Sequence, residues 1–587
     1  MAAKKSNAPT AEELAQMRHS AAHVLAEAVL EMFPEAKYAI GPPIDTGFYY
    51  DFDLPRTLTP DDLKILQKRM KKSVKKNLAI TGEQISKKDA KKIFANQPYK
   101  LELIEDIEEE TVGHFTHGDF EDLCRGGHAA STGQIGAFEL THVAGAYWKG
   151  DENNPMLQRV YGALFATDDE LQAYLKAREE AAERDHRRLG RELDLFFLDP
   201  LSPGSPFFLP GGTFVVNELT NYLRELYIKY GYDEVITPQL FSSELWKTSG
   251  HYENFQGDMF LVPIDDQEMG IKPMNCPGHC VLYSNTRHSY RELPMRIAEF
   301  TRLHRNERSG VLHGLTRARS FSQDDAHIFC TAEQLQDEIS KLFDMTKEIY
   351  AALGLENLTM YVATRGEKFI GDPKDWDIAE QLLMDSVSDA GFEYQVSEAE
   401  AAFYGPKIEM HLKDALNRSW QLGTIQLDQA MPKRFNLRYI NSEGNEQEPT
   451  MIHRALLGSL ERFIGIYLEY TAGKLPFWLS PTQISIIPIT DKHIDYCYEV
   501  QSDYKSLLIN AVVDDSSERM GAKIRNAQMN KIPFMFVVGD QEMDSGTVAV
   551  RTRNGEDFGQ IDRTEILNKL KSLKETRLID LNEIGKN

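Results

Sequence analysis

The fold of the central part of this chain is decided by RARSFSQDDAH, residues 317–327. Successive side chains of a strand point to opposite sides, so a strand here would place alternate residues on one face. That face would carry Arg317, Arg319, Phe321, Gln323, Asp325 and His327. Polar groups are costly to bury unpaired, so this is not an apolar core face. A solvated strand is the alternative, but it would not explain Phe321 beside Arg317. The pattern predicts a ligand site.

The residues before this stretch complete a predicted hairpin. Arg305 and Glu307 lie in the strand AEFTRLHRNER, and a loop over residues 309–316 joins the two strands. Arginine binds phosphate or carboxylate through two parallel N–H bonds, and an aromatic ring can stack on a purine. The hairpin therefore has the parts of a nucleotide site without a Gly-x-x-x-x-Gly-Lys loop.

Two later segments add candidate groups. Gly458 and Arg462 lie one helical turn apart in IHRALLGSLERFIG. A ligand could approach the backbone at the glycine while the guanidinium reaches over it, although an isolated helix arginine is more often a surface residue. Gln421 and Gln426 lie in the apolar strand WQLGTIQLD, where a buried amide needs a partner.

Two pairs of residues near the N-terminus share the same spacing. His19 and His23 are four residues apart in a predicted helix over 11–33, and Cys124 and His128 are four apart in DLCRGGH. On a helix this spacing places both side chains on one face. The pairs could hold zinc with four ligands, form a polar pocket for hydrolysis without metal, or be unrelated.

Length and composition describe an ordinary multidomain protein. The 587 residues suggest about three to five domains, and 42% hydrophobic with 27% charged residues is normal globular usage. The 66 basic and 90 acidic residues give a net charge of −24, which excludes a protein that coats nucleic acid by bulk charge. The 5 cysteines are too sparse for a disulfide scaffold, and no apolar run matches a membrane helix or secretory signal. We expect a cytoplasmic protein without a membrane span.

Charge and composition change along the chain at candidate boundaries. Residues 61–92 hold eleven Lys/Arg and four Asp/Glu, a local charge of +7 (11 − 4), which is either a solvated helix face or a phosphate-facing surface. A long charged helix is predicted over 168–193, and a Pro/Gly-rich entrance to the next domain follows at 199–212. The last segment alternates apolar strands with helices, which predicts a three-layer α/β domain.

These motifs together resemble class II aminoacyl-tRNA synthetases. The hairpin with Arg305 and Phe321 resembles their motif 2, and GSLER resembles motif 3. Pro238, in EVITPQLF, stands where motif 1 carries its proline, in the element through which these enzymes dimerise. More narrowly, threonyl-tRNA synthetases are similar to this chain over nearly its whole length, in KPMNCPGH, RNERSGVLHGL, FSQDDAHIFC, AFYGPKIE and MIHRALLGSLERF.

The resemblance implies a multidomain fold of mixed α/β and α+β class. An α+β editing domain would span 1–167 and a helical connector 168–198. A class II catalytic domain on an antiparallel sheet would span 199–474, followed by a three-layer α/β anticodon-binding domain at 475–587. Family members commonly begin with a small ubiquitin-like domain, which we expect to be missing here.

The implied activity is that of a threonine–tRNA ligase. ATP would activate L-threonine to threonyl-adenylate, and the threonyl group would pass to the 3′ end of tRNA(Thr). Mischarged seryl-tRNA(Thr) would be hydrolysed at the editing site. The implied partners are tRNA(Thr), ATP, L-threonine and a second copy of the chain, bound around Pro238. The alternatives are a non-catalytic RNA-binding or regulatory paralogue and another class II synthetase, such as a prolyl or seryl enzyme.

The resemblance also implies one Zn²⁺ per subunit for amino-acid recognition, and Mg²⁺ with ATP. The zinc ligands would be Cys276, His327 and His453. In the family the zinc takes the amino and hydroxyl groups of the amino acid, so valine is rejected. Serine lacks only a methyl group, worth about 1–3 kcal/mol, so a second, hydrolytic site is expected.

The remaining site residues carry over position by position. The ATP site would be Arg305, Glu307, Arg317, Phe321, Gln421 and Arg462, with the three arginines as catalytic groups. The threonine site would be Arg305, Gln323, Asp325, Tyr404 and Gln426. The editing site, acting through water without metal, would be His19, His23, Lys100, Asp122, Cys124 and His128. The anticodon would meet Glu542 and Arg551, whereas Ser517 stands where the family often has Asn.

Overall fold

The computed structural model describes residues 9–151, 153–356, 358–414, 418–428 and 430–585. They fall into two compact units, Met1–Glu180 and Ala181–Asn587. Among the residues described, no helix is both long and apolar enough to cross a bilayer.

The first unit is α+β, as the resemblance implies. Helix α1 (Ala11–Met32) begins at a capping box, in which the Thr10 hydroxyl accepts the Glu13 N–H at 3.2 Å and the Glu13 carboxylate accepts the Thr10 N–H at 2.7 Å. Helices α1 and α2 (Pro60–Lys76) bury their apolar side chains against an antiparallel sheet. Its strands are β1 (Lys37–Tyr38), β2 (Pro43–Ile44), β3 (Gly47–Asp53), β7 (Ala137–Tyr147) and β8 (Met156–Phe165).

A smaller layer completes this unit. Its three-stranded antiparallel sheet contains β4 (Thr81–Ser86), β5 (Thr111–His117) and β6 (Phe120–Leu123). Helices α3 (Lys87–Ile93) and α4 (Pro98–Asp106) cover it. Because β6 runs directly into Cys124, the small sheet fixes the position of the second predicted pair.

An eight-stranded sheet forms the centre of the second unit, as the resemblance implies. In spatial order its strands are β11 (Asp233–Glu234), β16 (Met295–Glu299), β19 (Asp325–Cys330), β26 (Thr450–Ala455), β23 (Ser419–Asp428), β22 (Lys407–Lys413), β20 (Leu358–Ala363) and β21 (Tyr394–Ser397). All neighbours are antiparallel except at the two ends, where β11 pairs with β16 and β21 with β20 in parallel.

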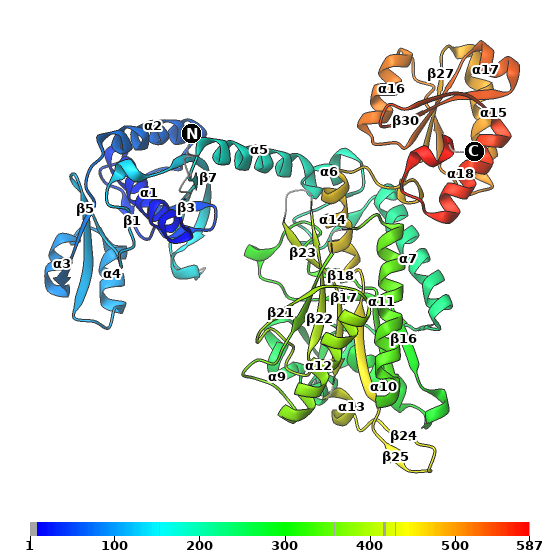
Figure 1. Cartoon of the computed structure of the whole chain (residues 1–587), viewed down its shortest axis with the longest axis horizontal. Helices are drawn as coiled ribbons and strands as arrows, with labels where there is room; N and C mark the ends of the chain where they lie inside the picture. The colour runs from blue at the N-terminus through cyan, green and yellow to red at the C-terminus, as the bar shows by residue number, and fades with distance from the viewer. Residues whose placement is uncertain (1–8, 152, 357, 415–417, 429, 586–587) are drawn as a thin grey trace, which may run out of the picture. The chain divides into compact units, whose positions relative to one another are not determined.

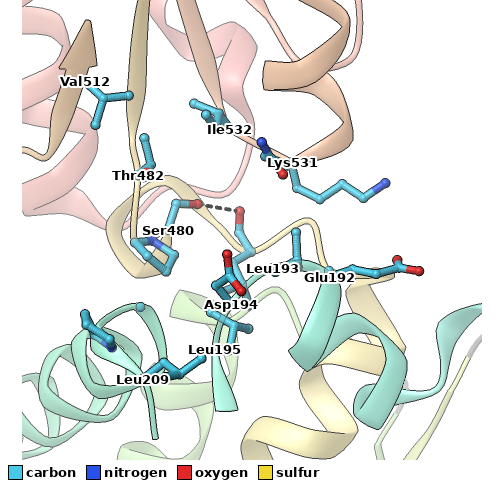
Figure 2. A pocket seen from close by; sticks show the side chains of 16 residues that line it. Glu192, Leu193, Asp194, Leu195, Leu209, Ser480, Thr482, Val512, Lys531 and Ile532 are labelled. Atoms are coloured by element: carbon cyan, nitrogen blue, oxygen red, sulfur yellow. Dashed lines mark hydrogen bonds between the residues drawn. The ribbon is translucent and has the colours of Figure 1, made fainter. Parts of the chain in front are cut away.

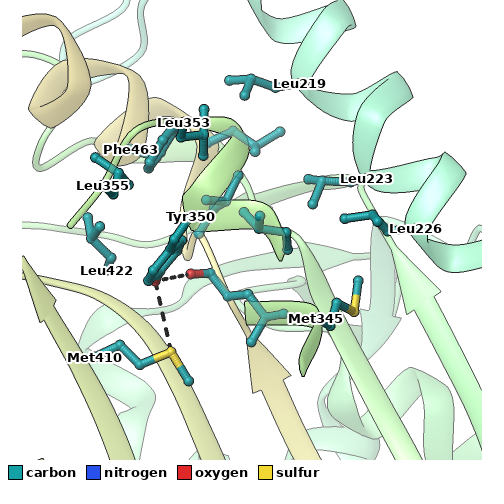
Figure 3. Packing of buried hydrophobic residues seen from close by; sticks show 14 of the residues in the cluster. Leu219, Leu223, Leu226, Met345, Tyr350, Leu353, Leu355, Met410, Leu422 and Phe463 are labelled. Carbon is teal, nitrogen blue, oxygen red and sulfur yellow. Dashed lines mark hydrogen bonds between the residues drawn. The ribbon is translucent and has the colours of Figure 1, made fainter. Parts of the chain in front are cut away.

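The apolar face of this sheet is covered by α7 (Pro210–Tyr230), α11 (Leu335–Ala352), α12 (Pro373–Asp389) and α14 (Leu460–Thr471). Figure 1 shows α7 and α11 alongside one another. In Figure 3, leucines of α7 point toward Met345 and Tyr350 of α11. The Tyr350 hydroxyl donates to the Leu456 carbonyl at 2.7 Å, so this core also anchors the loop before α14.

Smaller elements surround the large sheet. The short sheets are β9 (Phe196–Phe197) with β10 (Phe207–Phe208); β12 (Leu240–Ser242), β14 (Gln267–Ile271) and β13 (Phe260–Ile264); β15 (His288–Ser289), β24 (Tyr439–Ile440) and β25 (Glu446–Gln447); and β17 (Arg302–His304) with β18 (Ser320–Ser322). The further helices are α8 (Ser243–Ser249), α9 (His251–Phe255), α10 (Cys276–Ser284) and α13 (Met431–Arg434).

The C-terminal segment is a three-layer α/β domain, which confirms the prediction. Its strands, in spatial order, are β28 (Ala511–Val513), β27 (Ile484–Pro488), β29 (Phe534–Val538), β30 (Thr547–Thr552) and β31 (Asp557–Asp562). Ile484 and Ile486 pack with α15 (Ile494–Lys505) and α18 (Arg563–Thr576), whereas Ile487 packs with α16 (Met520–Met529) on the other face. Helix α17 (Asp540–Ser545) precedes β30.

Two predicted elements are divided in the structure. The charged helix expected over 168–193 is α5 (Asp168–Arg184) followed by α6 (His186–Glu192), because Asp185 leaves the helix and its carboxylate accepts the Arg187 N–H at 2.8 Å. The strand expected over 317–327 is also wrong as a single element. Its residues form β18 in a small hairpin and β19 in the large sheet.

Asp324 explains this second break. Its buried carboxylate accepts the backbone N–H groups of Leu456, Leu457 and Gly458 at 2.8, 3.1 and 2.9 Å. These bonds hold the turn between β26 and α14 against the start of β19 and interrupt the strand. The structure therefore brings the hairpin and the motif-3 turn together at one point.

Candidate active site

Three residues far apart in the sequence converge at the edge of a cavity. Cys276 begins α10, and His327 and His453 are direct cross-strand neighbours on β19 and β26. One possible ligand atom from each lies within 4.8 Å of those of the other two, and all three residues are buried. The predicted trio is thus assembled by the pairing of two central strands and the N-terminus of one helix.

Hydrogen bonds orient both imidazoles. Asp428 contacts Nε2 of His453 at 2.8 Å, and Nδ1 of His279 contacts Nδ1 of His327 at 2.8 Å. The remaining nitrogens, His327 Nε2 and His453 Nδ1, face each other at 2.9 Å. Metal-binding histidines are typically held in this way through their second nitrogen. Burial first, and then the two neighbouring imidazoles, lowers the pKa of His327, so its ring is neutral, the form that binds a metal. The donor set fits zinc.

A buried charge network supports this cluster. His279 contacts the Glu299 carboxylate at 3.2 Å, and Lys272 donates to the same carboxylate at 2.8 Å. Glu299 and Lys272 are fully buried, and Glu299 has a pKa lowered to about 2, because these bonds outweigh the opposing effect of burial. Sequence reasoning missed Asp428, His279 and Glu299, although His279 closes the quoted motif KPMNCPGH.

A cavity of about 350 Å³ lies beside this cluster. The residues that the resemblance predicts to bind the amino acid all line it. The predicted residues that line it are Cys276, Arg305, Gln323, Asp325, His327, Tyr404, Gln426 and His453. Tyr404 donates to Gln426 Oε1 at 2.5 Å, and Asn275 donates to Asp325 at 3.0 Å. Burial raises the pKa of Asp325 above its usual value. A pocket with these groups suits a small polar zwitterion.

The predicted nucleotide residues surround the hairpin. The Arg305 guanidinium lies over the Phe321 ring, 5.2 Å from its centroid, and Arg305 Nε donates to the Pro273 carbonyl at 3.3 Å. Glu307 accepts a hydrogen bond from Arg317 Nε at 3.0 Å. Arg317 is half-exposed, so its charge remains available to an anion in solution.

Arg462 approaches the same region from α14. Its Nη1 donates to the Thr316 carbonyl at 3.2 Å and its Nε to the Gln421 carbonyl at 3.3 Å. Burial, and then the like charge of Arg317, lowers the pKa of Arg462, so two guanidinium groups approach each other here, one of them paired with Glu307. Gln421 contributes its backbone at this point and does not line the amino-acid cavity, unlike Gln426. Gly458, with φ 74°, lies so close to the Leu422 carbonyl that a Cβ would approach it to 2.6 Å.

The two N-terminal pairs form one cluster in the first unit. Cys124 Sγ lies 3.3 Å from His19 Nε2 and 3.2 Å from His128 Nε2, and His23 completes the group within 4.8 Å. The reading as two unrelated pairs is therefore wrong. His23 contacts Asp122 at 3.4 Å, and Asp122 binds Lys100 at 2.5 Å, so all six predicted residues are connected.

The protonation of this cluster is set by burial. Burial, with a further contribution from Asp122, raises the pKa of Cys124 to about 11. Burial, and then His19, lowers the pKa of His128 to about 3. At neutral pH the cluster therefore presents a thiol and neutral imidazoles, which can accept or donate protons to a water molecule, but it offers no thiolate nucleophile.

The anticodon candidates lie on the C-terminal domain. Arg551, on β30, is partly exposed and pairs with Asp557 at 2.5 Å. Glu542 is nearly buried, and its carboxylate accepts the Gly539 N–H at 2.9 Å and a hydrogen bond from Gln560 at 2.7 Å. Arg551 is thus the more accessible of the two to RNA.

A larger cavity, of about 630 Å³, contains none of these residues. Figure 2 shows it beside Leu193, Asp194 and Leu195, with Val512 and Ile532 on the opposite side. It lies between the end of α6 and the sheet of the C-terminal domain. The residues predicted to bind the amino acid and the zinc ion line the smaller cavity instead.

The antiparallel sheet, the hairpin arginine and the helix arginine define a class II aminoacyl-tRNA synthetase, and comparisons with known proteins agree. The model of the tRNA synthetase class II core domain (G, H, P, S and T) matches residues 260–471, and that of the anticodon binding domain matches 483–573. The model of the Threonyl and Alanyl tRNA synthetase second additional domain matches 115–161.

Individual relatives indicate which family within this class the chain resembles. Threonine–tRNA ligase of Clostridium tetani is 48% identical over 567 residues, which is 96% of this chain and 89% of that protein. The enzyme of Thermotoga neapolitana is 47% identical over 568 residues, again 96% and 89% of the two chains. The crystal structure of the RNA binding domain of threonyl-tRNA synthetase from Cryptosporidium parvum has a TM-score of 0.64 at 43% identity, covering 66% of this chain and 98% of that one. The chain belongs to the threonyl-tRNA synthetase family.

Proposed function

We propose that this chain activates L-threonine with ATP, transfers it to tRNA(Thr), and hydrolyses seryl-tRNA(Thr) at a separate site. The observation that supports this most directly is one cavity that combines a Cys-His-His cluster with Arg305. The corresponding domains are 1–167 for editing, 168–198 as connector, 199–474 for catalysis and 475–587 for anticodon binding. A non-catalytic paralogue would not need these groups to converge.

Activation is achieved by positioning and by charge stabilisation. Arg305 binds the α-phosphate while Arg462 and Arg317 bind the outer phosphates, and Mg²⁺ accompanies the ATP. Phe321 and Glu307 hold the adenine. The threonine carboxylate attacks the α-phosphorus atom and diphosphate leaves; the 3′-terminal ribose hydroxyl of tRNA then attacks the carbonyl of the adenylate and AMP leaves. Neither step needs a covalent enzyme nucleophile.

Threonine is selected by the polar end of the cavity. Cys276, His327 and His453 would hold the zinc ion, which supplies a Lewis acid for the amino and hydroxyl groups of threonine. Asp428 and His279 keep the two imidazoles oriented. Gln323, Asp325, Tyr404 and Gln426 surround the remaining substrate atoms. A site built for a hydroxyl group discriminates strongly against valine, but it gains only about 1–3 kcal/mol against serine from the missing methyl group.

The first unit offers the second site that serine requires. His19, His23, Cys124 and His128 form a cluster of neutral proton donors and acceptors. Lys100 and Asp122 form a buried ion pair beside it. We assign hydrolysis of the seryl ester to a water molecule activated here without a bound metal. The same four side chains also have the composition of a zinc site, and the state of the Cys124 thiol distinguishes the two.

Association of two copies is supported by apolar residues near Pro238. Ile228 on α7 and Ile236 after β11 are 82% and 83% exposed. Strand β11 is also an end strand of the large sheet. Apolar side chains this exposed, beside an unpaired strand edge, favour burial against a second copy of the same surface.

We assign tRNA binding to basic groups on both units. We also assign the protein to the cytoplasm. Lys68, Lys71, Lys72 and Lys75 are exposed on α2 within the +7 stretch. Arg551 adds an accessible cation on the C-terminal domain. This distribution lets an acidic chain bind a polyanion locally.

The experiment that tests this proposal is exchange of labelled diphosphate into ATP in the presence of threonine. Arg305→Ala should abolish exchange because it removes the guanidinium at the α-phosphate. Arg291→Ala, an exposed arginine outside the cavity, serves as the matched control and should retain it. Full exchange in Arg305→Ala would overturn the assignment.

A further inference from the structure

A buried histidine at the start of α6 contacts both elements of the nucleotide site. His186 is fully buried, and no predicted role accounts for it. Its Nδ1 lies 2.7 Å from the Glu469 carboxylate on α14, and its Nε2 accepts the backbone N–H of Leu315 at 3.0 Å. Its own backbone N–H donates to the same carboxylate at 3.2 Å.

These contacts fix one form of the ring. A backbone N–H can only donate, so Nε2 is the acceptor and carries no proton. The proton therefore resides on Nδ1 and is donated to Glu469. Asp185, His186 and Glu469 also have the composition of a metal site, but the Leu315 N–H occupies Nε2 and the Arg187 side chain occupies the Asp185 carboxylate. The geometry indicates a structural connection and not a metal centre.

The connection leads directly to the arginines at the phosphates. Leu315 and Thr316 end the hairpin loop, and the Thr316 carbonyl accepts from Arg462 at 3.2 Å. Arg317 is the next residue. Glu469 lies on the helix whose first turn carries Arg462. His186 thus links the end of the motif-2 loop to the motif-3 helix through its hydrogen bonds to Leu315 and Glu469.

The backbone next to the His186 ring has glycine at two positions where a Cβ would crowd the ring. Gly314 has φ 52°, and a Cβ there would lie 2.1 Å from His186 Nε2. A Cβ on Gly465 would lie 3.2 Å from Leu315 Cβ and 3.3 Å from His186 Cδ2. Burial alone would raise the pKa of Glu469, but the bonds from His186 outweigh it and the pKa is lowered, so the acceptor is ionised. Arg418 shares this carboxylate at 2.6 Å.

We propose that His186 is a positioning residue for ATP: it holds the loop end at Leu315 so that Arg317 and Arg462 converge on the triphosphate. The inference rests on the proposed ATP role of these two arginines. His186 does not line the threonine cavity, so its proposed effect passes through these arginines.

Two variants separate its two bonds. The amide of His186→Gln reaches the position of Nε2 and can accept the Leu315 N–H, whereas the amide of His186→Asn reaches only the position of Nδ1 and can donate to Glu469. Because a buried N–H without an acceptor is costly, His186→Asn should raise the KM for ATP by about fivefold or more. His186→Gln should remain closer to wild type, and the KM for threonine should change little in both.

The measurements are steady-state diphosphate exchange and calorimetric ATP binding. The matched control is His493→Asn, which alters another buried, hydrogen-bonded histidine of the same unit, on the C-terminal domain. It should change thermal stability without changing the KM for ATP. A wild-type KM for ATP in His186→Asn, or parallel changes in both KM values and the melting temperature, would overturn the inference. Absence of threonine-dependent exchange in the wild-type protein would instead count against the proposed function, and ATP binding by calorimetry would still decide the role of His186.

Discussion

At the scale of single residues, burial determines what the polar side chains can do. Cys124 and His128 are kept neutral because desolvation penalises their charged forms. Arg462 and Arg317 remain close together although their like charges repel. The first arrangement suits proton transfer to water, and the second suits an anionic ligand that neutralises both cations.

The state of the Cys124 thiol can be measured directly. With its pKa raised to about 11, the thiol is protonated at pH 7, and its thiolate fraction grows as the pH rises toward 11. Alkylation by iodoacetamide, followed by mass spectrometry of the Cys124 peptide, should therefore be slow at pH 7 and accelerate with pH. The other four cysteines are buried and provide an internal reference. Rapid alkylation at neutral pH would contradict the protonated thiol, and alkylation that begins only after a chelator is added would indicate a metal-bound thiolate.

Editing can be separated from synthesis at the same scale. His19→Ala and Cys124→Ala should each slow deacylation of seryl-tRNA(Thr) by roughly 100-fold, because a positioned proton donor or acceptor is lost. Threonylation should persist. His142→Ala, which removes an exposed histidine of the same unit outside the cluster, should retain deacylation. Unchanged hydrolysis in both cluster variants would refute the assignment.

At the scale of elements, the active site depends on interrupted strands. Gln323, Asp325 and His327 reach one cavity because β19 begins only at Asp325, after Asp324 has bound the turn before α14. Arg454 lies beside Asp324, with its Nη1 3.6 Å from the carboxylate, and it is equally buried. A single carboxylate therefore joins the three strand and helix ends that form the site.

Replacing this carboxylate should destabilise the second unit. Asp324→Ala leaves three backbone N–H groups without acceptors and the buried Arg454 without its counterion, at a cost of about 3–5 kcal/mol. Asp324→Asn keeps one oxygen acceptor and should lose less. Differential scanning calorimetry, with the exchange rate as a second readout, measures both. Melting of Asp324→Ala at the wild-type temperature would show that the turn is held by other contacts.

Sequence patterns predicted some residues of the site and missed others. The i, i+4 spacing was sufficient to place His19 with His23, since both lie on one helix. The Cys276, His327 and His453 trio followed only from the family resemblance, because its members meet through strand pairing and not through sequence proximity. Asp428, His279 and His186 were missed because each acts through contacts with residues that are distant in the sequence. Periodicity also failed at Asp324, where a tertiary hydrogen-bond set overrides strand propensity.

At the scale of the whole molecule, the net charge does not predict whether the chain binds a polyanion. The chain carries −24, yet residues 61–92 carry +7, and several of these lysines are exposed on α2. Binding to a polyanion depends on the phosphates that are neutralised locally, and its salt dependence reports their number.

tRNA binding should therefore weaken steeply with salt in spite of the acidic composition. If about six phosphates are neutralised, the affinity should fall by about 1,000-fold between 50 and 200 mM salt. The triple variant Lys68→Ala, Lys71→Ala and Lys75→Ala should reduce the slope of log K against log salt by up to about three. A slope unchanged by this variant would assign the basic stretch to a solvated helix face.

Amino-acid-dependent diphosphate exchange, measured together with bound metal, tests the central claim most directly. The purified protein should contain about one zinc ion per chain and should exchange with threonine, more weakly with serine, and not with valine. A chelator that removes the metal should abolish exchange, and added zinc should restore both metal content and activity. Exchange that is far better with proline or serine than with threonine, or threonine-dependent exchange that survives complete loss of metal, would contradict the account.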